Sequence, residues 1–221
     1  MEKYIIVGIV LVAAILLHFI ITKVLTKKYT YKLMKLITQD EQTFLNELDS
    51  LVVKYLFPVF NREFFRLNYY IINTNDNKVK EQLSLMENIN MNHKQKLSLY
   101  QTVFKYFVSI NKKSDARNIL RKISAFVDEN NLDKDIKTAY EMEIKIYLDK
   151  DIKAIPYIDA QLEDCTDQEK AVKYLEKAYI YKANNQMTNA IDCMNKVIEF
   201  TEDPRQKETF KQLIDNNLED L

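Results

Sequence analysis

The sequence is short of the residues on which tight turns and phosphate sites depend. Among 221 residues there are one glycine, three prolines, two cysteines and two histidines, and there is no tryptophan. Glycine permits tight turns, phosphate-binding loops and β-bulges, because it adopts left-handed backbone angles at little cost. The chain is therefore expected to be all-α, with helices joined by short polar turns.

The same shortages argue against an enzyme. The sequence contains no glycine-rich phosphate loop, no H-E-x-x-H zinc motif and no G-x-S-x-G nucleophile motif. With two histidines, general acid–base chemistry has few candidates. Cys165 and Cys193 form no C-x-x-C pair, so they predict buried free thiols in a reducing compartment and no metal site. The pair Glu141 and Glu143 is typical of a solvated helix face. No cofactor is expected.

Charge is balanced overall but unevenly distributed. Lysine plus arginine and aspartate plus glutamate each number 32. Residues 1–36 hold six lysines and one glutamate, so the remainder carries a net charge of about −5. An acidic domain argues against a nucleic-acid-binding protein, because such proteins gain affinity from contacts between basic side chains and phosphates. The abundance of Asn, Lys, Ile and Tyr suggests a bacterial chain from an AT-rich genome.

A long apolar run lies near the N-terminus. Residues 4–22, YIIVGIVLVAAILLHFIIT, contain no formal charge. At about 1.5 Å per residue, a helix of this length nearly spans the ~30 Å hydrocarbon layer of a bilayer. A cleaved signal peptide is the alternative, but no A-x-A cleavage site follows the run. We therefore expect an uncleaved transmembrane anchor over residues 1–26, followed by a basic juxtamembrane segment over residues 27–38.

The lysines around the apolar run indicate its orientation. Five lysines follow it within about fifteen residues, against one lysine and the amino terminus before it. Basic residues stay inside, so the C-terminal domain is expected to face the cytoplasm from the cell membrane. His18 can stay neutral near the basic end of the run. Tyr29, Leu33 and Ile37 share one face, which suits either a helix on an anionic lipid surface or a plain flank of the anchor.

Beyond residue 38, apolar residues recur with helical spacing, and no stretch alternates with a period of two. The capping-box pattern Thr38-Gln-Asp-Glu41 predicts one leading helix over residues 39–60, ended by Pro58. Its expected buried residues are Phe44, Leu45, Leu48, Leu51, Val52 and Tyr55. Further helices come in pairs, and residues 204–221 are expected to form a C-terminal capping helix.

The clearest internal pattern is a period of 36 to 38 residues. A small apolar residue recurs near the start of the second helix of each pair, and a set of three mostly large residues recurs in the helix before it. The small residues are Val79, Ala116, Ala154 and Ala190, and the sets are Tyr100/Phe104/Phe107, Tyr140/Ile144/Tyr147 and Tyr174/Ala178/Tyr181. Small residues let helices approach closely. No single hairpin buries its own apolar face, so consecutive hairpins are expected to stack.

These units resemble the tetratricopeptide (TPR) family of helical repeats over residues 61–203. The best match runs from Tyr174 to Tyr181 and continues nine residues later at Ala190, with aromatic and small residues at the family's offsets. Lys177 replaces an expected apolar residue and the usual turn glycine is absent, so a related helical-hairpin repeat is an alternative. The resemblance implies a solenoid of stacked hairpins.

The resemblance also implies a concave surface lined by first-helix residues outside the core sets. These residues are Gln101, Lys105, Val108, Leu175, Tyr179 and Lys182. An aromatic side chain flanked by lysines can receive an acidic or amphipathic peptide. The chain is therefore expected to be a membrane-anchored cytoplasmic adaptor or scaffold that binds a protein or peptide partner. The alternative is an accessory factor of an export or envelope-assembly machine, with the repeat domain outside the cytoplasm.

Overall fold

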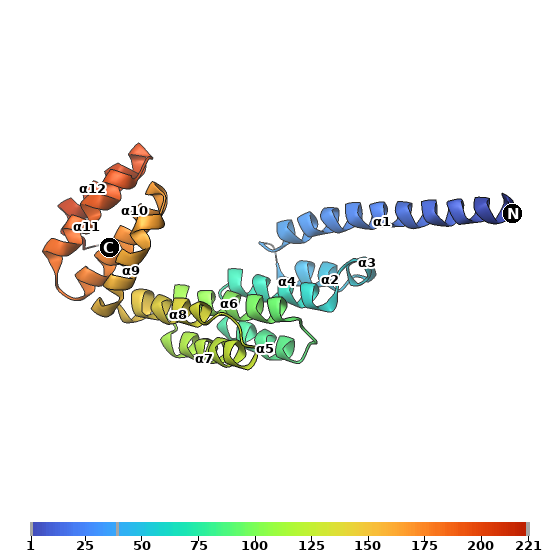
Figure 1. The fold of residues 1–221 in the computed structure, drawn as a ribbon, viewed down its shortest axis with the longest axis horizontal. Helices are drawn as coiled ribbons and strands as arrows, with labels where there is room; N and C mark the ends of the chain where they lie inside the picture. Colours follow the sequence, from blue (N-terminus) through green and yellow to red (C-terminus); the bar gives the residue numbers. More distant parts are fainter. Residues whose placement is uncertain (1, 39, 220–221) are drawn as a thin grey trace. The chain divides into compact units, whose positions relative to one another are not determined.

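The computed structural model describes the backbone of residues 2–38 and 40–219, and the side chains of residues 16–38 and 40–219. Within these residues the chain is helical almost throughout and contains no β-strand, which confirms the all-α prediction (Figure 1). The chain forms two compact units, Met1–Val103 and Phe104–Leu221.

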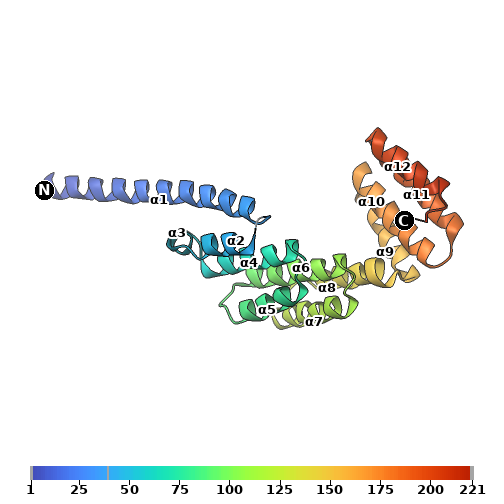
Figure 2. The same cartoon turned by 180° about the vertical axis from the view of Figure 1, so that it is seen from behind.

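The first unit begins with one long helix that is followed by shorter ones (Figures 1 and 2). Its helices are α1 (Glu2–Leu36), α2 (Glu41–Leu48), α3 (Leu51–Leu56), α4 (Val59–Ile72) and α5 (Asp76–Glu87). The helix α6 (His93–Ser109) runs across the boundary between the two units.

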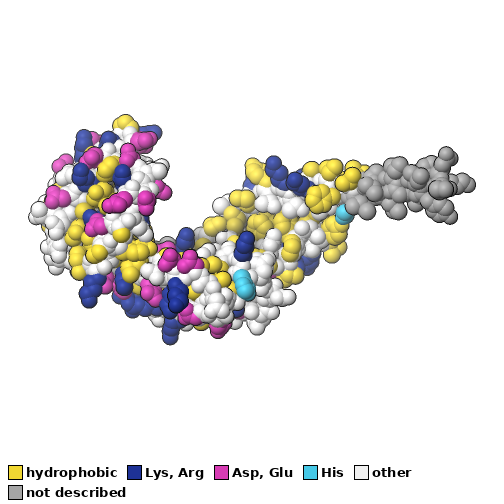
Figure 3. Space-filling model, in the orientation of Figure 1, with side chains coloured by type: hydrophobic (Ala, Val, Ile, Leu, Met, Phe, Trp, Pro, Cys, Tyr) yellow, Lys and Arg dark blue, Asp and Glu magenta, His cyan; other side chains and the backbone are white. Residues whose placement is uncertain are grey.

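The C-terminal part of α1 packs against protein. Leu33 is fully buried in a core that it shares with Phe44 of α2, and Tyr29 and Ile37 pack against the same core. Lysines occupy the outer side of α1 (Figure 3), and Lys32 forms an ion pair with Glu47. Of the two interpretations of residues 27–38, the one that lays their apolar face on an anionic lipid surface is wrong, because α2 and α3 pack against that face.

Most side chains of the predicted membrane anchor lie outside the part of the chain that the structure describes. The backbone of residues 4–22 belongs to α1, and the side chains of residues 4–15 lie outside the described part. In the part of the chain that the structure describes, no helix combines the length and the apolar character needed to cross a membrane.

The prediction of a single leading helix over residues 39–60 is wrong, because this range contains α2, α3 and the start of α4. Asp40 caps α2, in place of Thr38, by accepting a hydrogen bond of 2.9 Å from the Thr43 N–H. Ser50 then caps α3 by accepting one of 3.3 Å from the Val53 N–H. The Ser50 cap starts a new helix and changes the direction of the chain. Its hydroxyl accepts a hydrogen bond that a backbone carbonyl would accept inside one continuous helix.

The break between α2 and α3 also changes which residues are buried. Phe44 and Leu48 are buried as predicted, and the α3 residues in the core are Val53 and Leu56. Of the other four residues predicted to be buried, Leu45 is partly buried against the core. Leu51, Val52 and Tyr55 are exposed.

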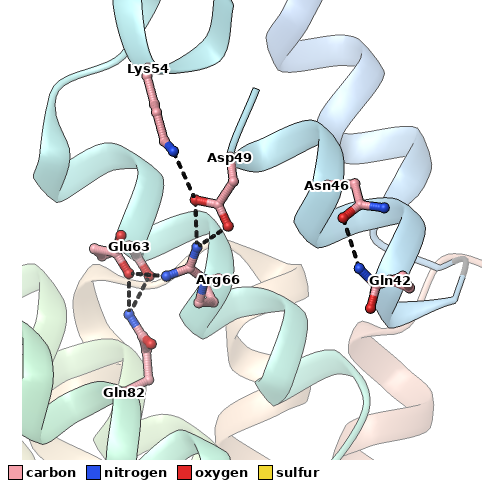
Figure 4. A network of polar contacts seen from close by, with 7 residues as sticks. All are labelled: Gln42, Asn46, Asp49, Lys54, Glu63, Arg66 and Gln82. Carbon is pink, nitrogen blue, oxygen red and sulfur yellow. Dashed lines mark hydrogen bonds and ion pairs between the residues drawn. The ribbon is translucent and has the colours of Figure 1, made fainter. Parts of the chain in front are cut away.

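A polar network joins the end of α2 to α4 and α5 (Figure 4). The Arg66 guanidinium donates to Asp49 at 3.0 and 3.1 Å and to Glu63 at 2.8 Å. Glu63 in turn accepts a hydrogen bond of 2.9 Å from Gln82, which is 2% exposed. Because a buried amide must find partners, this network orients α5 against α4.

The second unit contains the remaining helices, and one of them is a π-helix. They are α7 (Lys113–Glu129), α8 (Lys134–Glu143), the π-helix η1 (Ile144–Asp149), η2 (Ile152–Ala154), α9 (Ile155–Gln161), η3 (Leu162–Asp164), α10 (Asp167–Ala183), α11 (Met187–Phe200) and α12 (Pro204–Asp215). The helix α12 begins at Pro204, as predicted, and packs against α11.

All four small residues of the predicted period, Val79, Ala116, Ala154 and Ala190, are fully buried. In the packed helix pair α10–α11, Ala190 and Ala178 are both fully buried in one apolar core. Cys193 is buried in this core as expected, whereas Cys165 is only partly buried. The burial of these alanines is what close helix packing requires, and the assignment of the pairs to a repeat family stays a prediction.

Candidate functional site

A cavity of about 550 Å³ opens in the second unit. Its walls are the C-terminal end of α6, α8 with the π-helix η1, α9 and α10. Apolar and aromatic walls come from Val108, Met142, Ile146 and Tyr157, and the polar groups are Lys105, Glu143, Tyr147, Gln161, Lys173 and Glu176. This volume and this mixture of walls are those of a site for a small molecule or for side chains of a peptide.

The π-helix positions two residues of the cavity. Single π-turns insert an extra residue into a helix and often occur at functional sites. Here Ile146 is buried with Ala154, Ile158 and Ile180, whereas the neighbouring Tyr147 is 39% exposed. The prediction that Tyr147 belongs to a core set with Tyr140 and Ile144 is therefore wrong, because the wider turn moves it out of register.

The deepest polar group of the cavity is the carboxylate of Glu176, which is 5% exposed. The Tyr147 hydroxyl donates a hydrogen bond to Glu176 Oε1, and Lys173 Nζ lies 3.1 Å from Glu176 Oε2. Burial raises the pKa of Tyr147 well above its ordinary value, and the hydrogen bond to Glu176 raises it further. The tyrosine thus remains a neutral donor, and both oxygens of Glu176 are satisfied from within the cavity.

Glu143 differs from Glu176, although both line the cavity. Within the described residues, its carboxylate has no hydrogen bond and no ion pair. Burial raises the pKa of Glu143, and the positive charge of Lys105 opposes that rise without forming an ion pair. The interpretation of Glu143 as part of a solvated helix face holds only in part, because its side chain is partly buried where it lines the cavity. Its carboxylate is available to a ligand, at a position where removal from water makes a cationic partner favourable.

The residues predicted for a concave binding surface do not all line the same cavity. Lys105 and Val108 both line the cavity. Leu175 lines a different cavity of about 600 Å³ between α10, α11 and the start of α12. Gln101 is partly buried in the first unit, Tyr179 lies under Lys150 with Nζ 4.8 Å from its ring centre, and Lys182 donates to the backbone oxygens of Leu218 and Glu219.

Sequence analysis did not identify Glu143, Lys173 or Glu176 as site residues. The sequence held one signal for Glu176, which lies four residues before Ile180, an apolar residue outside the predicted core set of α10. The structure buries both residues. Two apolar stripes on one helix indicate that it is buried on two sides, and an acidic residue in the second stripe is then a site candidate. The π-turn that exposes Tyr147 has no comparable signal in the residue pattern.

Comparison with protein-family models, with curated proteins and with solved structures finds no match to this chain. The TPR resemblance rests on the residues quoted above. The features of the chain that bear on its function are the cavity and the distribution of charge and apolar residues.

Proposed function

We propose that this chain is a membrane-anchored adaptor, and not an enzyme, that binds an amphipathic segment of a protein partner in the cavity of its second unit. The observation that carries the proposal is the carboxylate of Glu143, which is partly buried beside the apolar walls of the cavity. It has no hydrogen bond or ion pair to any residue that the structure describes. An apolar segment bearing one basic side chain complements these walls and this charge.

The other polar groups of the cavity support binding more than catalysis. Tyr147, Lys173 and Glu176 are joined to one another, so they keep fixed positions, and the raised pKa of Tyr147 keeps its hydroxyl protonated. Such a group shapes a binding site, whereas general acid–base catalysis needs a group that exchanges protons near neutral pH. Glu143 and Lys105 are left to contact a partner. Together they favour a peptide segment with both a basic and an acidic side chain over a strongly acidic segment.

The sequence supports the membrane anchor and the cytoplasmic orientation. Residues 4–22 are uncharged and belong to the continuous helix α1, and Lys23, Lys27 and Lys28 follow them on its exposed side. In this proposal the second unit is a TPR-like stack of hairpins held near the membrane. Tethering raises the effective concentration of the adaptor for partners in the same membrane.

Partner binding is tested with the full chain in its native membranes. A photo-reactive amino acid at Gln161, which lines the cavity, is expected to join the chain to its partner, while the same group at the exposed Glu199 is not. Glu143→Gln is expected to abolish the Gln161 cross-link because it removes the charge that the basic side chain needs. Glu141→Gln, outside the cavity, is the matched control and is expected to keep the cross-link.

The melting temperatures of the variants distinguish the loss of a contact with the partner from the loss of folding. Glu143→Gln removes a half-buried charge, so its melting temperature is expected to equal or exceed that of the wild type. Cross-linking that is unchanged in Glu143→Gln, or equally strong from Glu199, would show that the partner does not occupy the cavity.

A further inference from the structure

The helix α3 is apolar on both of its sides. Val53 and Leu56 are buried in the core of the first unit. On the opposite side Leu51 is 85% exposed and Tyr55 is 68% exposed, with Val52 beside them. Six residues with two apolar sides leave a large apolar area uncovered, which in soluble proteins is rare outside interaction surfaces.

The exposed side of α3 lies beside the end of the apolar run of α1. The two helices pack together, and the Tyr55 hydroxyl oxygen is 3.3 Å from His18 Nε2. His18 is four residues before Thr22, the last residue of the run, which corresponds to about 6 Å along a helix. Tyr55 is therefore held about 6 Å inside the apolar end of the predicted anchor.

The apolar surface of α3 continues onto α1. Five large apolar side chains at the end of the run are exposed (Figure 3): Leu16, Leu17, Phe19, Ile20 and Ile21. The exposed lysines Lys23, Lys27 and Lys28 follow on α1, and α3 carries the exposed Lys54. Both helices thus combine exposed apolar side chains with lysines, as segments at a membrane surface do.

We propose that α3 is a second membrane-contacting element, which lies in the interface of the bilayer beside the anchor and inserts Leu51, Val52 and Tyr55 among the lipids. This inference rests on the proposed function, because it requires residues 4–22 to span a membrane. A depth of about 6 Å agrees with that of interfacial helices, which enter the bilayer by roughly 5–10 Å. Tyrosine is enriched at this depth, because its ring is apolar and its hydroxyl is polar.

The occupant of this surface is a lipid bilayer and not a second protein, because α3 is attached to the anchor itself. If residues 4–22 span the membrane, His18 lies within the bilayer, and the exposed groups packed beside it contact lipid. Contact with the bilayer at two elements also restrains the tilt of the first unit, which a single anchor helix leaves free.

The absence of tryptophan makes a direct test possible. The full chain is reconstituted into phosphatidylcholine vesicles with brominated acyl chains, which quench tryptophan fluorescence on contact. Three single-tryptophan variants are compared: Leu51→Trp on α3, Phe19→Trp on the anchor, and Leu85→Trp on α5, which is 60% exposed in the same unit. All three positions are exposed, so each is expected to accept the larger side chain.

We expect Leu51→Trp to be quenched nearly as strongly as Phe19→Trp, and Leu85→Trp to be unquenched. If Phe19→Trp is quenched and Leu51→Trp is not, the anchor stands and the contact of α3 with lipid is overturned. If neither is quenched, the anchor itself fails, and this inference fails with it. Emission of Leu51→Trp that is shifted to shorter wavelength but unquenched would mean that a second copy of the chain covers α3, which also overturns the proposal.

Discussion

At the scale of single residues, asparagine occupies positions that usually belong to glycine. Asn111, Asn131 and Asn185 have positive φ angles of 57°, 49° and 59°, and each is the second residue after a helix. At the end of α10, the Gln186 N–H donates to the Tyr181 carbonyl at 2.9 Å, which closes the turn. Asparagine tolerates this conformation better than other residues with a Cβ atom, so a chain with one glycine can still form compact helical hairpins.

The preference for glycine at such a position makes a prediction about stability. Asn185→Gly is expected to stabilise the chain by up to about 1 kcal/mol, because it removes the residual strain of the Cβ atom at φ 59°. The same substitution at Asn189, inside α11, is the matched control and is expected to destabilise by about 0.5–1 kcal/mol. Thermal melting of the two variants measures both changes in stability. A lower melting temperature for Asn185→Gly than for the wild type would contradict the expected strain at Asn185.

At the scale of helices, the fully buried alanines determine how closely paired helices approach. Ala190 of α11 and Ala178 of α10 share a core with Met194 and Val197. A methyl side chain lets the two backbones come close, and the larger residues one turn away fill the space beside the contact. Replacing a small residue there tests whether the 36-to-38-residue period marks helix crossings.

Ala190→Leu is expected to overpack the crossing of α10 and α11 and to lower the stability by about 1–3 kcal/mol. Ala183→Leu makes the same change at an exposed position of α10 and is expected to cost less than about 0.5 kcal/mol. The difference in melting temperature between the two variants is the measurement. Equal melting temperatures would show that Ala190 does not lie at a close helix crossing, and so would contradict the interpretation of the 36-to-38-residue period where its pattern is clearest.

At the scale of the whole molecule, the proposed function depends on which side of the membrane carries the second unit. The lysines of α1 favour the cytoplasm, and the alternative of an export or envelope-assembly factor requires the opposite side. Lys23, Lys27 and Lys28 are exposed, so they can be replaced without disturbing the core that α1 forms with α2 to α4.

A reporter that is active only outside the cytoplasm, fused after Leu221, is expected to be inactive. Replacing Lys23, Lys27 and Lys28 with glutamine is expected to raise its activity, because the orientation signal is weakened. The activity of the reporter in intact cells is the measurement. High activity with the unchanged sequence would refute the cytoplasmic orientation and favour the export-factor alternative.

The sequence by itself determined the all-α class, the burial of Ala116 and Ala190, and the helix that begins at Pro204. These features follow from local causes. Glycine scarcity, a helical apolar period and the fixed φ of proline act within one or two turns of the chain, so they can be read from neighbouring residues.

Only the tertiary structure decided which polar groups meet and which apolar faces stay uncovered. Glu143 and Glu176 are 33 positions apart in the sequence, and each has the pattern of an ordinary helix surface until α8 and α10 line one cavity. The exposure of Leu51 depends on Ser50, whose hydroxyl competes with the backbone and splits the predicted helix. Both outcomes rest on packing between distant segments, and such packing overrides the local pattern because the free energy of burial depends on what covers a face.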